Sequence, residues 1–151
     1  MSGVSYYIMQ LKVLDPIKHI RKAKHLYLEN TDVSEKELVE NLIRDAKHFG
    51  ITAKVKECSG FHFVYSDTDW FDTIDISTYE LFSRVHGLEG AGMNSHRSEV
   101  LLNAFAEDVI VYRKKEYIPI KISDRSYTDI AVEVISSNFS EQKLVVAFRV
   151  R

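Results

Sequence analysis

Residues 34–66, SEKELVENLIRDAKHFGITAKVKECSGFHFVYS, contain the local pattern that decides the fold. Apolar residues in the first half recur three or four positions apart: Leu38, Leu42, Ala46 and Phe49. Ser34 and Glu37 form a capping box at the start of this repeat, and Gly50 follows it as a C-terminal stop. An apolar stripe bounded by these two signals predicts an amphipathic helix at about 34–49.

After Gly50 the apolar residues alternate, which is the period of a β-strand. The alternating residues are Ile51, Ala53 and Val55, and then Phe61, Phe63 and Tyr65. Ser59 and Gly60 separate the two runs, and a two-residue turn that contains glycine is typical of a hairpin. The stretch therefore predicts a helix followed by an antiparallel hairpin.

The residues that precede this stretch predict a strand and another helix. Residues 4–13 are rich in β-branched and aromatic side chains, which predicts a first strand that is largely buried. Asp15 and Pro16 suit the N-cap and the first position of a helix. Its apolar stripe would consist of Ile17, Ile20, Ala23 and Tyr27. A further strand at these positions is the alternative.

Two short helices are expected between the hairpin and the final third of the chain. Ser77 or Thr78 can cap a helix that runs through Val85, and Asn94 or Ser95 can cap the next one. The second helix would carry Val100, Leu101, Ala104 and Phe105. Glycines at positions 87, 90 and 92 separate the two helices.

The final third of the chain predicts β-structure. The expected strands cover residues 109–112, 117–122, 130–134 and 144–150. Pro119 has no amide proton and therefore favours an edge strand. These strands would form a C-terminal β-meander. We therefore interpret residues 1–151 as a single α+β domain, a mostly antiparallel sheet with three to four helices packed on one side.

Composition limits the classes to which the protein can belong. The 151 residues are about one domain in length, and their formal net charge is only −2. Cys58 is the only cysteine, which excludes an internal disulfide and fits a reducing compartment. No apolar run approaches membrane-span length, and the start of the chain lacks the pattern of a secretory signal. We expect a soluble cytoplasmic protein with no membrane partner.

The charge is distributed unevenly, because residues 66–108 contain nine acidic and two basic residues and carry −7. Four of these carboxylates, at positions 67, 69, 72 and 75, surround the only tryptophan, and tryptophan is enriched among interface hot spots. The expected partner-binding residues are Asp67, Asp69, Trp70, Phe71, Asp72, Asp75, Tyr79 and Glu80. They predict a small non-enzymatic protein-binding module, such as an inhibitor or toxin-immunity protein. Its partner would be a basic protein, such as a nucleic-acid-directed enzyme.

Two alternatives to this hypothesis remain open. In the first, Trp70 and Phe71 fold into the core and the aspartates cap helix ends. In the second, the protein is a small enzyme or ligand-binding domain that holds a phosphate-bearing molecule at the glycine-rich turn 87–97, with His86 as an acid or base. The anion-binding residues would be Gly90, Gly92, Ser95, His96 and Arg97. This turn matches no established phosphate-loop pattern, and it can equally be a plain connection between helices.

No other residues form a recognisable chemical motif. The six histidines lack metal-site spacing, the aspartates after Ser66 fail the calcium-loop pattern, and no residue is selected as a base for Cys58. We therefore expect no catalytic residues, no metal and no cofactor. A basic group could contact phosphates, and it consists of Lys18, Arg21, Lys22 and Lys24 with His19 and His25. The overall pI of about 6.3 argues against direct nucleic-acid binding.

Overall fold

The computed structural model describes residues 15–29, 32–88, 90 and 95–151. The strand expected at 4–13 lies outside these residues, as do Gly92 and Asn94. The described part forms one α+β domain with a five-stranded, fully antiparallel sheet in the order β1-β2-β5-β3-β4. The strands are β1 (Lys54–Cys58), β2 (Phe61–Ser66), β3 (Asp108–Arg113), β4 (Glu116–Lys121) and β5 (Leu144–Arg149).

The two hairpins at the edges of the sheet confirm the local turn signals. Cys58 pairs with Phe61 across Ser59 and Gly60, whose φ angles of +55° and +82° suit a tight hairpin turn. A second turn with two positive φ angles joins β3 to β4. Pro119 lies in β4, an edge strand as expected, next to an irregularity in the β3–β4 register.

The expected strand at 130–134 is wrong, because these residues belong to helix α7 (Arg125–Asn138). Asp124 caps this helix by accepting a hydrogen bond from the Ser126 amide at 2.9 Å. Ala131 and Ile135, one helical turn apart, are fully buried, and Phe139 follows them into the same apolar cluster. The expected C-terminal β-meander is therefore also wrong. The last strand, β5, instead lies at the centre of the sheet between β2 and β3.

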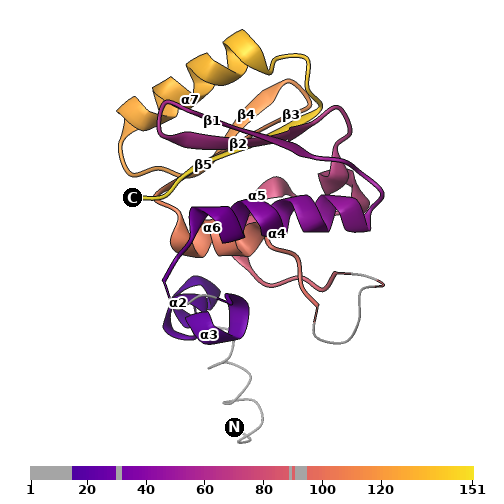
Figure 1. The fold of residues 1–151 in the computed structure, drawn as a ribbon, viewed down its shortest axis with the longest axis vertical. Helices are drawn as coiled ribbons and strands as arrows, with labels where there is room; N and C mark the ends of the chain where they lie inside the picture. Colours follow the sequence, from indigo (N-terminus) through magenta and orange to yellow (C-terminus); the bar gives the residue numbers. More distant parts are fainter. Residues whose placement is uncertain (1–14, 30–31, 89, 91–94) are drawn as a thin grey trace, which may run out of the picture.

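The helices occupy both faces of the sheet, so their expected placement on one side is also wrong. Figure 1 shows α7 across one face, while helices α4, α5 and α6 cover the other. Helix α4 (Glu35–His48) matches the predicted helix, and α5 (Thr78–Ser83) starts after Ser77 as expected. Helix α6 (Glu99–Phe105) begins four residues beyond the expected Ser95 cap. The reason lies at its first turn, where Asp45 of α4 accepts a hydrogen bond from the Ser98 amide at 2.7 Å.

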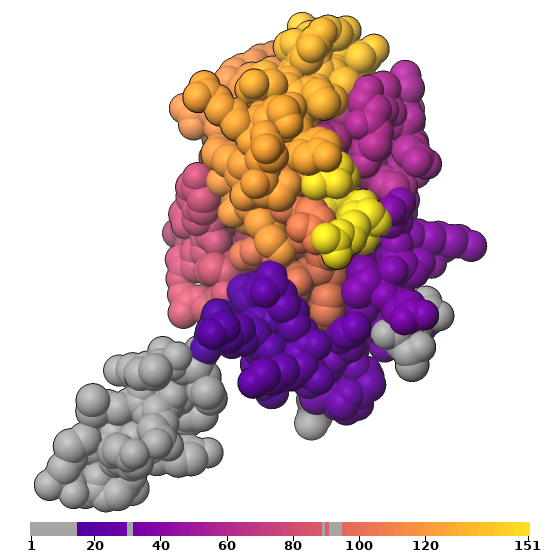
Figure 2. Space-filling model, turned by 90° about the vertical axis from the view of Figure 1, so that its left-hand side faces the viewer, coloured from indigo at the N-terminus to yellow at the C-terminus, as the bar shows by residue number. Residues whose placement is uncertain are grey.

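Two short N-terminal helices lie beyond α6, on the side away from the sheet (Figure 1). Helix α2 (Pro16–Lys22) begins at the Asp15 cap with Pro16 in its first turn, which confirms a helix here, and α3 (Lys24–Tyr27) follows directly. Arg21 donates a hydrogen bond to the Ala104 carbonyl at the end of α6, at 2.7 Å. Figure 2 shows α7 and these N-terminal helices at opposite ends of the molecule. Among the described residues, no helix combines the length and the apolar character needed to span a bilayer.

Candidate ligand-binding pocket

The expected aromatic anchors lie in the core and not on the surface. Trp70 and Phe71 form a short 3₁₀ turn, η1 (Trp70–Thr73), and their exposed fractions are 0% and 1%. Asp69 caps this turn by accepting the Phe71 amide at 3.0 Å. Phe71 packs edge-on against Phe82 of α5, with ring centroids 5.7 Å apart. Exposed anchors were therefore the wrong prediction. The alternative of core aromatics with a capping aspartate is confirmed at this turn.

Two carboxylates of the acidic segment are already paired with cations of the same chain. Arg113 of β3 donates to Asp69 and to Asp72, each at 2.8 Å, and also to the Thr78 hydroxyl at 3.0 Å. Lys114 lies 3.4 Å from Asp72. These pairs reduce the negative field that a basic partner would meet.

The rest of the acidic segment is spread over the surface. Asp67, Asp75 and Tyr79 are exposed, and Glu80 forms an ion pair with Arg84 one turn along the chain. Tyr79 is the only exposed aromatic side chain among the expected partner-binding residues. The described part of this segment therefore does not form the aromatic and acidic surface that was predicted.

Arg97 is also unavailable for the role expected from the sequence. Its exposed fraction is 3%, and its guanidinium donates to Glu99 at 2.7 and 3.0 Å and to Thr73 at 2.8 Å. In the described structure, the Arg97 guanidinium is therefore already paired with side chains of the same chain. The Asp45 carboxylate accepts the amide of Ser98, the N-cap residue of α6, at the helix end where a bound anion was expected to lie. Gly90 is described and has a φ of +81°, which accounts for a glycine there.

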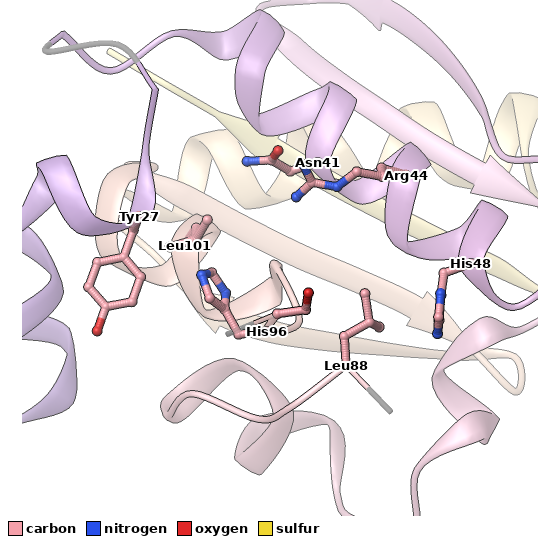
Figure 3. Close-up of a pocket in the computed structure, with 8 residues that line it drawn as sticks. Tyr27, Asn41, Arg44, His48, Leu88, His96 and Leu101 are labelled. Atoms are coloured by element: carbon pink, nitrogen blue, oxygen red, sulfur yellow. The ribbon is translucent and has the colours of Figure 1, made fainter. Parts of the chain in front are cut away.

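A pocket of about 420 Å³ lies beside this turn, between α4 and the segment that leads into α6. Its lining residues are Tyr27, Asn41, Arg44, His48, Leu88, Ser95, His96 and Leu101. We call it the α4 pocket. Figure 3 shows Asn41, Arg44 and His48 projecting from α4, with Tyr27 of α3 and His96 across from them. It therefore draws on four separate parts of the chain.

Local structure explains how these side chains meet. Asn41, Arg44 and His48 are spaced by three and four residues, which places them on one face of α4. His96 is held by a bridge to Gly87 and by the Arg97 amide, which donates to the His86 carbonyl at 2.8 Å. Its ring meets Tyr27 edge-on at a centroid distance of 5.4 Å. The geometry is set by helix and bridge contacts.

The lining of the α4 pocket is cationic and polar at its walls and apolar below them. Arg44 is the charged side chain among the described lining residues, and no carboxylate is among them. His48 and His96 contribute imidazole nitrogens, while Leu88 and Leu101 supply apolar surface. A guanidinium presents several N–H donors in a fixed plane, which suits carboxylate or phosphate oxygens.

Two buried acids lie behind the pocket wall. Asp45 and Glu99 are both 0% exposed, and one oxygen of each lacks a hydrogen-bond partner in the described structure. Burial, with a smaller contribution from the Glu99 charge, raises the pKa of Asp45 to about 6. Nearby, burial and then the Arg84 charge lower the pKa of His86. Asp45 was not selected from the sequence, although its position on the inner side of the helix expected at 34–49 was the available signal.

Metal chemistry finds no support among the described residues, where no three His, Cys, Asp or Glu side chains gather as ligands. The chain matches no protein-family model, and neither a curated protein nor a solved structure resembles it significantly. The geometry of the pocket is therefore the basis for a functional proposal.

Proposed function

We propose that this protein is a ligand-binding domain that holds a small anionic molecule in the α4 pocket. The observation that carries the proposal is the composition of the lining, which has Arg44 as its charged side chain, two imidazoles beside it and no described carboxylate. Small-molecule sites are typically concave, with a few convergent polar groups among apolar ones. The pocket has both features, and its volume of about 420 Å³ is within the usual range for such sites.

The polar groups differ in what they contribute to binding. Arg44 would contact the anionic group of the ligand, because within the described part of the chain it has no ion pair. Tyr27 and His96 lie together at one end and offer ring surface to a planar group. Phosphate-bearing molecules, the ligand class of the alternative hypothesis, therefore suit this pocket, with Arg44 in the role expected of Arg97.

The basic residues of α2 and α3 support the same proposal. Lys18, Lys22 and Lys24 are exposed on the two helices that end at Tyr27. A positive field beside a pocket raises the local concentration of anions and speeds their entry. Residues 67–80 give less support to the binding of a basic protein, because Trp70 and Phe71 are buried and Arg113 pairs with two carboxylates of this segment.

Thermal unfolding with a panel of anions tests the proposal. The panel contains inorganic phosphate, citrate, and adenosine and guanosine mono- and triphosphates. A ligand that binds only the folded state at about 100 times its Kd stabilises that state by ~2.7 kcal/mol and raises Tm accordingly. We expect at least one anion to produce such a shift.

Variants distinguish the pocket from general ionic effects. Arg44→Gln removes the charge and keeps a polar side chain, so it should remove the Tm shift. Arg125→Gln removes an exposed arginine at the start of α7 and should keep it. The proposal fails if no anion raises Tm, or if Arg44→Gln responds as strongly as the unmodified protein.

A further inference from the structure

A second hollow lies on the other flank of α4, between that helix and strand β1. It has a volume of about 510 Å³, and its lining residues are Glu35, Lys36, Val39, Glu40, Ile43, Val55, Glu57 and His62. We call it the β1 groove. Val39, Ile43 and Val55 form an apolar floor, and 43% of Val55 is exposed. An exposed apolar strip with charged residues around it is typical of an interaction surface.

Strand β1 is an open edge of the sheet, because among the described strands it pairs with β2 alone. Cys58 and Phe61 flank a two-residue turn and therefore form a hydrogen-bonded pair. Backbone hydrogen bonding alternates along an antiparallel strand, so the amides and carbonyls of Val55 and Glu57 are directed away from β2. These two residues thus offer backbone groups to a further strand and side chains to the β1 groove.

The rim of the groove is acidic. Glu35, Glu40 and Glu57 lie along it, and Lys36 is its one lysine, 3.9 Å from Glu40. His62 lies between Glu35 and Glu57, with Nε2 3.4 and 3.8 Å from their carboxylates. The lysines of β1, Lys54 and Lys56, alternate with Val55 and so project from the other face of the sheet. A segment that combines apolar and cationic residues would complement this surface.

We propose that the β1 groove binds an extended, basic segment of a partner protein, which adds a strand to the edge of β1. Every second side chain of the segment faces the groove. On that face, apolar residues lie over Val55 and Lys or Arg residues lie beside Glu40 and Glu57, while the side chains between them project toward the face of Lys54 and Lys56. The open backbone groups favour a strand over a helix, because strand addition satisfies them directly. The site is independent of the α4 pocket, since the two use opposite flanks of α4.

Peptide binding tests the proposal on the full chain. The probes are fluorescent octapeptides that carry Val, Ile, Leu or Phe together with Arg or Lys at alternate positions, and Ser or Thr between them, so that the apolar and basic side chains share one face of the strand. Fluorescence anisotropy at physiological salt should show saturable binding of at least one such peptide. Its analogue with Glu in place of every basic residue should not bind. N-methylation of alternate backbone amides should also weaken binding, by about tenfold or more, because it removes strand hydrogen bonds.

Variants locate the binding surface. Val55→Arg fills the groove with a cation, and Glu57→Lys reverses the charge of its rim, so both should weaken binding by about tenfold or more. Glu133→Lys makes the same charge reversal on exposed α7 and should bind as the unmodified protein does. Circular dichroism establishes that each variant is folded. If Val55→Arg or Glu57→Lys does not fold, Glu40→Lys, which also reverses a charge of the rim, takes its place.

Each contrary result overturns the proposal. The proposal is wrong if no basic octapeptide binds saturably, or if the acidic analogue binds equally well. It is also wrong if Val55→Arg and Glu57→Lys bind the peptide as tightly as the unmodified protein does. Tighter binding of a helical basic peptide would exclude strand addition. Self-association that Val55→Arg abolishes would assign the β1 edge to a second copy of the chain.

Discussion

The buried carboxyl of Asp45 should make the protein less stable as the pH rises through the weakly acidic range. Its pKa is about 6 in the folded state, compared with 3.8 for an ordinary aspartate. The folded protein therefore holds this proton more tightly than the unfolded chain does. The stabilisation that comes from this tightly held proton is complete below the unfolded pKa of 3.8 and is lost as the pH rises through 6. Asp45→Asn should remove this dependence, because asparagine is neutral throughout.

The expected size follows from the two pKa values. A difference of about two units corresponds to ~3 kcal/mol. Asp45 is 0% exposed, so solvent does little to reduce the cost of its buried charge. Asparagine keeps a side-chain oxygen that can accept the Ser98 amide, which Asp45 accepts at 2.7 Å. The variant should therefore match the unmodified protein near pH 4 and exceed its unfolding free energy by ~2 to 3 kcal/mol near pH 7.

Urea unfolding measured across this pH range tests the prediction. The relevant quantity is the difference in unfolding free energy between the two proteins at each pH, because titrating groups that do not interact with Asp45 cancel in that difference. Asp129→Asn, an exposed substitution on α7, controls for the change in net charge. A difference that stays constant from about pH 4 to about pH 7, within ~0.5 kcal/mol, would refute the reasoning.

Two further predictions concern the ion pairs of β3 and the first hairpin. Arg113→Met should lower the unfolding free energy by ~3 kcal/mol, because it leaves Asp69 largely buried without its cation, whereas Lys114→Met at an exposed pair should cost below ~1 kcal/mol. Equal losses in urea unfolding would contradict the role of Arg113. Gly60→Ala should cost ~1 to 2 kcal/mol, because residue 60 has a φ of +82°, while Gly87→Ala, with no positive φ and open space for a Cβ, should cost less. Thermal unfolding that ranks the two glycine variants in the opposite order would contradict this.

The sequence predicted correctly those elements in which the end signals and the spacing of apolar residues indicate the same secondary structure. Helix α4 has a Ser34 cap, an apolar stripe and a terminal Gly50, and the first hairpin has its own turn residues. Helix α7 was missed because Ile130, Val132 and Val134 alternate like a strand, while the buried pair Ala131 and Ile135 is helical. Both periods fit the same short segment, and the sheet face that α7 covers decides between them.

The candidate sites were harder to predict because they depend on contacts between distant segments. The density of aspartates around Trp70 suggested exposure, but Arg113 from another strand pairs with two of them and Phe82 helps to bury the turn. Arg44 was expected on a helix, yet nothing in the sequence indicated that Tyr27 and His96 would lie opposite it. Packing between elements, and not local pattern, determines both surfaces.

The position of β5 has a consequence for how the chain reaches its native state. The hairpins β1–β2 and β3–β4 can each form from neighbouring residues, but the strand that joins them is made last. On the ribosome, β2 and β3 would each wait with one unsatisfied edge until residues 144–149 emerge. The unpaired edges of β2 and β3 in such a nascent chain can pair with strands of other chains. This risk of aggregation ends only when β5 is inserted between them.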